Sequence, residues 1–464
     1  MTASELLSRR EVTSKLFRSK WGVAGIAILL ALISVSIYAL VAIPLESNKE
    51  WSNPTYWQDY PKSVAPAWTN LGSGDRFVEH TILTSANAIT SESISQGTKA
   101  VTYSWKIDYH YESYPSNIIL DTTVTYSKQP ILQLDIVRPD GKDFKLYYST
   151  LPSPQSSSST FSRRVTSDDA IMQASLKSHV GEFMCSVDAA KPRIMIFSDT
   201  QECRVLKGIY TVTETLYFFG DSDAVNDAKF ILGGQVFGPM GTDDLGRDLS
   251  IGILWGAPVA LFIGLVVAVV STLIGLIYGV FAGFKGRHVD EGMMRINDIF
   301  YSLPFLPLLI ILSVSIGRSI FLFVGFLVLF GWVGMAKISR SLALQIKNLQ
   351  YVEAAKLMGE SDTKIIFRHI IPQLLPITFA SIALTVPAAI LGEAALSFLG
   401  LGDPTIPTWG RILHDANSAG AAARGLWWWV MIPGLMIALT GVAFILIGNT
   451  LNTIVNPRSR IRVG

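Results

Sequence analysis

Long apolar runs constrain this chain more than any other feature of its sequence. The first covers residues 21–43, and five more follow at 251–284, 300–316, 320–336, 374–399 and 426–447. A helix needs about 20 mostly apolar residues to cross the hydrocarbon core of a bilayer. The sequence, of which 50% is hydrophobic and 16% charged, therefore predicts an α-helical polytopic membrane protein with six transmembrane helices in the lipid bilayer.

The distribution of Lys and Arg predicts which side of the membrane each connection occupies. Basic residues gather before position 21, at 285–295, at 337–368 and after position 455. With six spans these groups all fall on one side, and basic connections are typical of the cytoplasmic side. We therefore expect a multi-pass protein of the plasma membrane with both termini in the cytoplasm. A signal peptide is the alternative for the first run, but the run is too long and lacks a clear cleavage site.

Residues 45–236 differ from the apolar runs, because they are polar and rich in Ser, Thr, Tyr and Pro. Strand-like alternation occurs at 99–108, 122–126, 131–137 and 208–219. This pattern predicts a large β-rich extracellular domain, inserted between the first two spans and large enough to bury a core. The expected organisation is 1–44 for the cytoplasmic tail and first span, 45–236 for the insertion, and 237–464 for the other five spans.

The chain has two cysteines, Cys185 and Cys203, and both fall in the segment expected outside the cell. Thiols in that compartment are usually oxidised. We therefore expect a Cys185–Cys203 disulfide. Two buried free thiols acting as small hydrophobes are the alternative.

A polar island separates the fourth and fifth apolar runs. Its first part places Val352, Ala355 and Met358 on one helical face. Gly359 is a natural stop for that helix. The small side chains of Ala354 and Ala355 would allow another surface to approach the backbone closely. The expected structure is a docking knob on the cytoplasmic side, and an ordinary amphipathic connection between spans is the alternative.

The second part of the island predicts another short helix. Ser361 or Asp362 can cap its start, and the helix is expected to run to Pro372. Arg368 is among the basic residues that it carries. No phosphate-binding Gly-rich loop with a Gly-Lys-Ser/Thr ending occurs in the chain, so no site for ATP hydrolysis is expected in it.

The island resembles the EAA loop of ABC-importer permeases. The matching residues are Glu353-Ala354-Ala355, then Gly359, then a segment that ends at Pro372. His369 and Ile371 depart from the general form of this motif, but an Arg-His-Ile-x-Pro ending is similar to the dipeptide/oligopeptide subfamily. Further matches to the C-type subunits of that subfamily lie at 17–20, 241–248, 289–291, 392–402 and 407–410. The insertion at 45–236 departs from the family pattern, in which this connection is short.

The resemblance implies a type I ABC-importer permease that forms half of a translocation pathway for di- or oligopeptides. It implies a heterodimer with a second permease, two cytoplasmic ATPase subunits and an extracellular solute-binding protein, with no nucleic-acid partner. ATP and Mg would be used by the ATPase subunits, and this chain would carry no cofactor, no metal and no catalytic residue. The residues implied to dock the ATPases are Glu353, Ala354, Ala355, Gly359, Arg368 and Pro372.

Two further places are candidate functional sites. Glu393 lies within a predicted span, where a carboxylate is costly and is a functional candidate by default. It would act as an outer gate or, as we favour, as a structural group for the Gly-rich loop after it. The stretch GTDDLGRD at 241–248 predicts a tight turn with Asp244 or Asp248 capping the next helix. Its resemblance to the C-type subunits implies an extracellular elbow that includes Asp243, Arg247 and Asp248.

Other functions stay open from the sequence. A transporter of the same class could carry oligosaccharides or another small solute. A membrane receptor with a ligand-binding ectodomain is a further alternative. Copurification of two ATPase chains would favour the transporter, whereas a stable lone chain would favour the receptor.

Overall fold

The computed structural model describes residues 15–44, 50–72, 74, 76–95, 97–154, 158–185 and 191–455. The chain divides into a helical unit, from residues 1–53 and 250–464, and a β-rich unit, from residues 54–249. The residues after 236, which the sequence assigned to the membrane part, thus belong to the β-rich unit as far as Leu249. The reason is backbone pairing: Thr242 donates to the Val64 carbonyl at 3.0 Å, and Ser63 donates to the Asp243 carbonyl at 2.7 Å.

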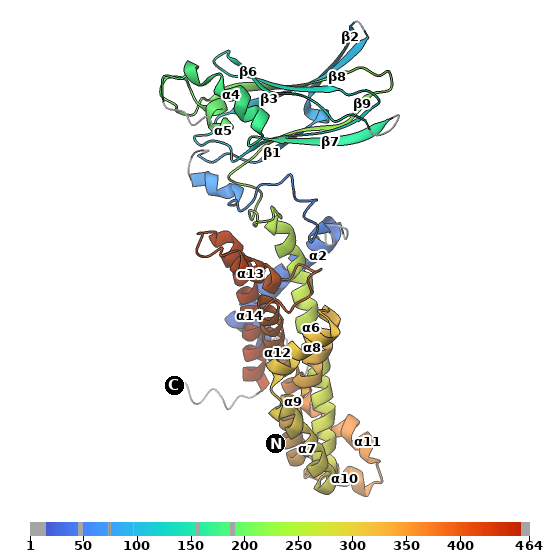
Figure 1. Cartoon of the computed structure of the whole chain (residues 1–464). Helices are drawn as coiled ribbons and strands as arrows, with labels where there is room; N and C mark the ends of the chain where they lie inside the picture. The colour runs from blue at the N-terminus through green and yellow to red at the C-terminus, as the bar shows by residue number, and fades with distance from the viewer. Residues whose placement is uncertain are drawn as a thin grey trace. The chain divides into compact units, whose positions relative to one another are not determined.

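The helical unit contains the candidate membrane spans (Figure 1). Five described helical segments are long and apolar enough to cross a membrane. They are α2 (Lys20–Ala42), α6 (Leu249–Lys285), α9 (Ile320–Ile346), the stretch Asp362–Phe398 that ends in α12 (Ile371–Phe398), and α14 (Trp427–Val455). The apolar runs therefore predicted the positions of these five candidate spans.

The span expected at 300–316 is not one straight helix. It is divided between α7 (Arg287–Ser302) and α8 (Phe305–Ile316), which meet at an angle of 74°. Pro304 starts α8, and the residue before it, Leu303, is extended with ψ 131°. A proline disfavours helical geometry at the preceding residue, so the helix stops there. The chain has six candidate spans only if this bent pair counts as one.

The connection expected at 400–425 also contains a helix, α13 (Trp409–Ser418). Thr408 caps its start, because the Thr408 hydroxyl accepts from the backbone N–H of Arg411 at 3.1 Å. Trp409 is buried and donates its indole N–H to the carbonyl of Ile253 in α6 at 2.9 Å. This connection is therefore packed onto a span.

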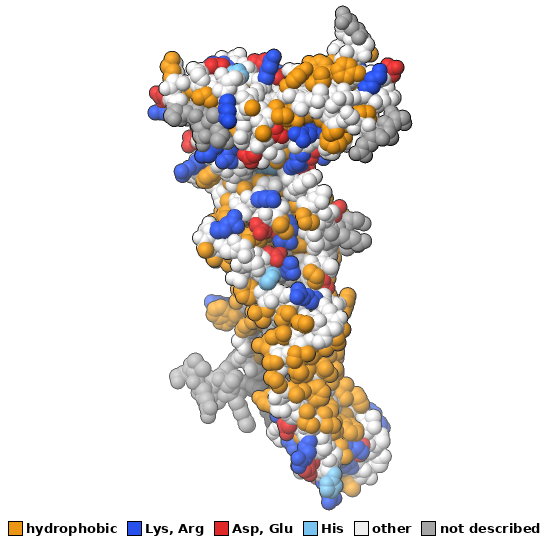
Figure 2. Space-filling view, in the orientation of Figure 1, with side chains coloured by type: hydrophobic (Ala, Val, Ile, Leu, Met, Phe, Trp, Pro, Cys, Tyr) orange, Lys and Arg blue, Asp and Glu red, His pale blue; other side chains and the backbone are white. Residues whose placement is uncertain are grey.

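Small residues bring the spans into close contact. A Cβ on Gly279 of α6 would lie 2.1 Å from the Ala336 carbonyl of α9, so only glycine fits there. One turn away, the Ser339 hydroxyl of α9 donates to the Gly275 carbonyl at 2.9 Å. Such close approach is typical of helix packing in membranes. In Figure 2, hydrophobic side chains cover the middle of the helical unit, and charged ones gather at the end with α10 (Gln350–Leu357) and α11 (Asp362–Ile365).

The β-rich unit is a sandwich of two antiparallel sheets (Figure 1). Its strands are β1 (Thr81–Thr84), β2 (Ile89–Ser95), β3 (Thr98–Tyr109), β4 (Ile118–Tyr126), β5 (Ile131–Val137), β6 (Asp143–Thr150), β7 (Ser159–Thr166), β8 (Gly208–Phe218) and β9 (Ala224–Leu232). One sheet has the order β1-β9-β4-β7 and the other β2-β3-β8-β5-β6. The four segments predicted as strands lie in β3, β4, β5 and β8, so those predictions are confirmed.

Alternation explains why these four strands could be recognised. In β4 and β8 every second side chain is buried, and the two sheets share one core that includes Leu120, Leu134 and Leu216. The remaining strands are less regular, and β2 is exposed along its whole length. The helices α4 (Ala170–Lys177) and α5 (Pro192–Phe197) lie together at one end of the sandwich (Figure 1).

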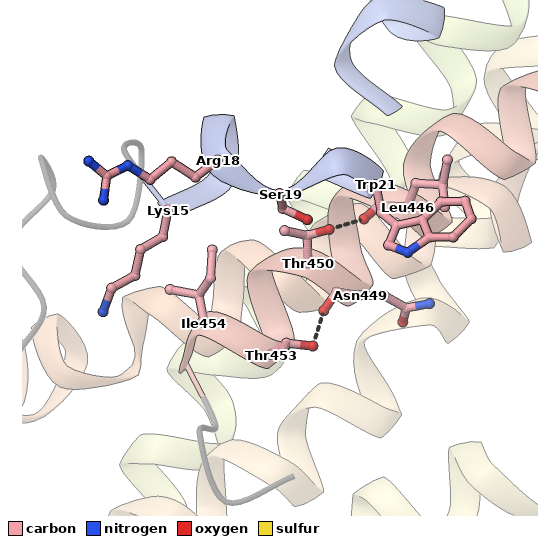
Figure 3. A pocket seen from close by; sticks show the side chains of 9 residues that line it. All are labelled: Lys15, Arg18, Ser19, Trp21, Leu446, Asn449, Thr450, Thr453 and Ile454. Carbon is pink, nitrogen blue, oxygen red and sulfur yellow. Dashed lines mark hydrogen bonds between the residues drawn. The ribbon is translucent and has the colours of Figure 1, made fainter. Parts of the chain in front are cut away.

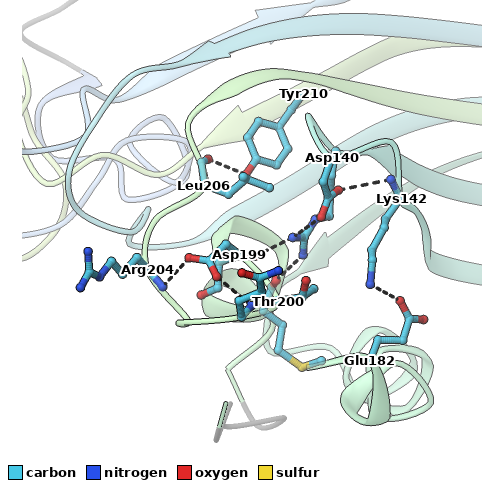
Figure 4. A network of polar contacts seen from close by, with 12 residues as sticks. Asp140, Lys142, Glu182, Asp199, Thr200, Arg204, Leu206 and Tyr210 are labelled. Atoms are coloured by element: carbon cyan, nitrogen blue, oxygen red, sulfur yellow. Dashed lines mark hydrogen bonds and ion pairs between the residues drawn. The ribbon is translucent and has the colours of Figure 1, made fainter. Parts of the chain in front are cut away.

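A polar network (Figure 4) fixes the chain around α5, and a disulfide closes the same region. Arg138 is almost fully buried and donates to the carbonyls of Met195 and Ser198, at 3.0 and 2.6 Å. The structure joins Cys185 to Cys203, with the Cα atoms 5.9 Å apart. The two cysteines thus close a loop that contains α5, and Arg138 anchors the end of that helix to the end of β5.

Candidate functional site

The helix α10 opens the polar island and has one buried face. Val352 and Ala355 pack against Phe284 at the end of α6 and Ala343 on α9. Met358, which the helical spacing placed on the same face, is instead 77% exposed. That prediction is wrong because α10 ends at Leu357, and Met358 already belongs to the turn.

Gly359 ends this helix in the way predicted. Its φ is +81°, in the left-handed region that glycine occupies without strain. The N–H of Glu360 donates to the Ala355 carbonyl at 3.1 Å, and that of Gly359 to the Lys356 carbonyl at 3.0 Å. These bonds satisfy the last carbonyls of α10. No atom lies within 4 Å of a Cβ built on Gly359, so its φ alone makes the position special.

The second helix starts at the predicted position but does not end at the predicted one. Ser361 stands at the cap position of α11 without a side-chain cap bond, and Asp362 binds Lys285 of α6 at 2.6 Å. The helix does not end at Pro372. It continues through a π-helical turn at Ile366–Ile370 into α12. Pro372 lies just after the π-helical turn, at the second position of α12. Because α11 is continuous with α12, a movement of α11 would be transmitted directly to that candidate span.

Glu360 ties α11 to the π-helical turn. Its carboxylate accepts from Lys364 at 2.9 Å and pairs with His369 Nε2 at 2.8 Å. Hydrogen bonds from Lys364 and then from His369 hold the pKa of Glu360 below its usual value. Behind α10, the Lys356 ammonium lies 4.7 Å from the ring centroid of Phe284. These contacts hold the turn after Gly359 against the π-helical turn and the end of α6.

The outer side of the island is exposed and partly apolar. Leu357 is 89% exposed, and Met358 and Phe367 are exposed beside the basic residue Arg368. Leu357 and Met358 are neighbours in the chain, and exposed apolar side chains that lie together are typical of a protein-binding surface. We call Leu357, Met358 and Phe367 the apolar knob. Sequence reasoning missed Leu357 and Phe367, although two large apolar residues in a polar island were a usable signal.

The structure divides the predicted docking residues between the two sides. Glu353, Ala354, Gly359, Arg368 and Pro372 are exposed, so a partner could contact them. Ala355 is 2% exposed and packs inside the chain. Its small side chain therefore allows α10 to approach α6 and α9, and does not admit a partner.

Ion pairs connect the helices that support the island. Arg340 of α9 binds Asp290 of α7 through two bonds of 2.5 Å. The amide of Asn297 on α7 donates to the Val333 carbonyl of α9 at 3.1 Å. The Lys347 ammonium at the end of α9 donates to the Gly283 carbonyl of α6 at 3.1 Å. The island thus rests on a connected base that includes α6, α7 and α9.

Glu393 is buried and hydrogen-bonded within its own helix. It is 6% exposed, and its carboxylate accepts from the Ser397 hydroxyl one turn later at 2.6 Å. Thr408, the cap of α13, lines the same small cavity. This arrangement favours the structural role of Glu393 over that of a gate.

The stretch at 241–248 is a tight turn, as predicted, and Asp243 closes it. Asp243 is fully buried, and its carboxylate accepts from the backbone N–H groups of Leu245 and Arg247, each at 2.9 Å. The Arg247 side chain pairs with the same carboxylate at 2.5 Å. Thr242 bridges to Asp248 across the turn. Asp243 therefore organises the backbone of this turn, and Asp248 directly precedes α6, where a helix cap was predicted.

The site as a whole is an exposed surface joined to helices that are candidate membrane spans. Among the described residues, no group of three or more His, Cys, Asp or Glu could hold a metal ion. The chain has several candidate membrane spans, and its exposed knob lies on the connection between two of them. These features are those of a membrane protein whose helices α10 and α11 present an exposed surface between two candidate spans.

The similarity to known proteins identifies the class. Residues 275–461 match the family described as binding-protein-dependent transport system inner membrane component. The dipeptide transport system permease protein DppC of Bacillus subtilis is 40% identical over 221 residues, which cover 47% of this chain and 68% of that protein. The oligopeptide transport system permease protein OppC of the same organism is 38% identical, with 47% and 72% covered. The OppC protein of Haemophilus influenzae is 38% identical, with 47% and 70% covered.

The chain therefore belongs to the family of binding-protein-dependent transport permeases, and it is a transport protein and not an enzyme. It is a multi-pass inner-membrane component, and its class implies a binding protein and an ATPase as partners. The β-rich unit at residues 54–249 lies outside the matched residues.

Proposed function

We propose that this chain forms half of the translocation pathway of an ABC importer for di- and oligopeptides. The observation that carries the proposal is 40% identity over 221 residues to a protein named as a dipeptide transport permease. The second half of the pathway would come from another permease subunit. An external solute-binding protein would deliver the peptide, and two cytoplasmic ATPase subunits would supply the free energy from ATP and Mg.

The geometry of the polar island supports a mechanical role in this cycle. The apolar knob would sit in a recess of an ATPase subunit. Closure of the ATPase pair would push α10 and α11, and the push would pass through the π-helical turn into α12 and through Lys285 and Asp362 into α6. The spans would then open alternately to the two sides of the membrane. In this role the chain binds the ATPase subunits, transmits their movement to the spans and lines the translocation pathway. The ATPase subunits hydrolyse the ATP.

The substrate class is tested by uptake in cells that express the complete transporter. We expect labelled di- and oligopeptides to accumulate with this chain present and to stop accumulating without it. Unlabelled peptides should compete and oligosaccharides should not, because the matched permeases are named for peptides. Competition by an oligosaccharide, with none by peptides, would contradict the proposed substrate.

The orientation of the β-rich unit is tested with its two cysteines. We expect the unit outside the cell and the Cys185–Cys203 bridge intact. Alkylation of the unfolded, unreduced protein should then add no alkyl groups to its mass. After mild reduction of intact cells, a membrane-impermeant maleimide should label both thiols. Two alkyl additions without reduction would exclude the bridge, and labelling only after lysis would place the unit inside.

A further inference from the structure

A cavity of about 610 Å³ lies in the helical unit, between the start of α2 and the end of α14. Figure 3 shows Lys15 and Arg18 at one end of the view, Trp21 beside Leu446 at the other, and Asn449, Thr450 and Thr453 of α14 between them. Its volume is in the range of sites that hold small ligands. It is distinct from the polar island, and the proposed transport cycle does not use it.

The charge of the cavity is positive. Lys15 and Arg18 are its charged lining residues, and none of the lining residues is Asp or Glu. Among the residues that the structure describes, no carboxylate pairs with either cation, and both side chains are exposed at the rim (Figure 3). An ammonium and a guanidinium together offer several N–H donors and favour a phosphate.

The hydroxyl groups of the cavity complement a different part of a ligand. Thr450 donates to the Leu446 carbonyl at 2.7 Å, and Thr453 donates to the Asn449 carbonyl at 2.8 Å. Each hydroxyl has therefore used its only proton, and its oxygen can accept from a ligand. Ligand hydroxyls beside a phosphate would suit these oxygens.

The position of the cavity points to a lipid. Both α2 and α14 are candidate membrane spans, and the cavity lies where α2 begins and α14 ends. Trp21 is 69% exposed at the start of α2, as is typical of an aromatic side chain at a membrane interface. Deeper along the pair, a Cβ on Gly25 would lie 2.8 Å from the Ala443 carbonyl, so the two helices close the cavity below.

We propose that this cavity binds the phosphoglycerol headgroup of an anionic phospholipid. Lys15 and Arg18 bind the phosphate, and the oxygens of Thr450 and Thr453 accept from the glycerol hydroxyls. The acyl chains lie along the apolar outer surface of the two spans. The bound lipid thereby joins the segment before α2 to the end of α14. Basic pockets between membrane helices are suited to such headgroups.

The test is native mass spectrometry of the purified full-length chain, titrated with phosphatidylglycerol, phosphatidylcholine or inorganic phosphate. We expect Lys15→Ala/Arg18→Ala to bind phosphatidylglycerol about tenfold more weakly than the wild type, and less so at high salt. Phosphatidylcholine binding should be equal in the two proteins. The exchange Lys15→Arg/Arg18→Lys should keep the affinity, because it keeps both charges.

The control Lys128→Ala/Lys177→Ala removes two exposed cations from the β-rich unit and should bind phosphatidylglycerol as the wild type does. Equal phosphatidylglycerol affinity in the wild type and in Lys15→Ala/Arg18→Ala would overturn the proposal. An equal loss in the control would also overturn it, because attraction would then follow net charge alone. Saturation by inorganic phosphate at the same concentration would assign the site to a soluble anion instead of a lipid.

Discussion

Replacement of Gly359 by Val is expected to lower ATP-driven uptake about tenfold while the protein stays folded. Gly359 has a φ of +81°, and a non-glycine side chain in the left-handed region costs about 1–2 kcal/mol. A Cβ would meet no atom within 4 Å, so the variant suffers from backbone strain and not from a clash. Relief of that strain would turn α11 relative to α10 and displace the apolar knob. Uptake and ATPase copurification should be measured together on membranes with equal amounts of the chain.

Two matched variants separate backbone strain from side-chain size at this position. Gly359→Asn should keep most of the uptake, because Asn tolerates positive φ far better than Val. Gly292→Val adds the same side chain at an exposed position of α7 where a Cβ also meets no atom, and it should have little effect. Normal uptake in Gly359→Val, or an equal loss in Gly359→Asn, would contradict the role given to this glycine.

The second prediction with a large expected effect is that the β-rich unit loses stability as pH rises. Glu214 on β8 is fully buried between the sheets, where the Thr122 hydroxyl donates to its Oε1 at 2.5 Å. Its other oxygen has no hydrogen-bond partner among the described residues, and its neighbours across the sheet are Tyr103 and Leu134. Burial raises the pKa of Glu214 to about 8, although the bond from Thr122 opposes that rise.

The direction of the effect follows from proton binding. The folded pKa lies above the ordinary value of 4.5, so folded Glu214 keeps its proton where the unfolded chain has lost it. This stabilisation is fully present below about pH 4.5 and is lost as pH rises through about 8. Buried His80 acts oppositely at lower pH, because burial lowers its pKa from 6.5 to about 4. The contribution of His80 is complete above pH 6.5, so the loss due to Glu214 is clearest above that pH.

We expect the β-rich unit to lose about 2 kcal/mol of stability between pH 6.5 and pH 8, since one pKa unit corresponds to about 1.4 kcal/mol. The measurement is thermal unfolding of the full chain, followed by circular dichroism of the β-sheet. Glu214→Gln should remove most of this pH dependence, whereas Glu92→Gln on the exposed strand β2 should keep it. The same slope in Glu214→Gln and in the wild type would show that Glu214 is not the titrating group.

The spans and the regular strands could be predicted from the sequence because one physical property determines each of them. Apolar length marks a span wherever it occurs, and burial of alternate residues marks β4 and β8. The division of the third run could not be judged from hydropathy, because both helices adjoining Pro304 remain apolar at their junction. The exposed strand β2 lacked the alternation that would have marked it.

The turn at Gly359 could also be predicted, because only a few residue types suit a left-handed backbone. Which side chains around it face outward could not. Met358 and Ala355 share a helical face by spacing, yet one is exposed and the other buried. The end of α10 and its packing against α6 and α9 decide this, and that packing joins residues far apart in the sequence. The same limit hid the role of Asp243, whose partners depend on the exact path of the turn.

The central claim is that the apolar knob is the surface that an ATPase subunit contacts. It is tested by placing a photo-crosslinking amino acid at Leu357 or Met358 in cells that express the complete transporter. Tyr301 on α7, which is also strongly exposed, serves as the control position. We predict a cross-link to an ATPase subunit from Leu357 and Met358, and none from Tyr301. No ATPase cross-link from either knob position, or an equally strong one from Tyr301, would contradict the claim.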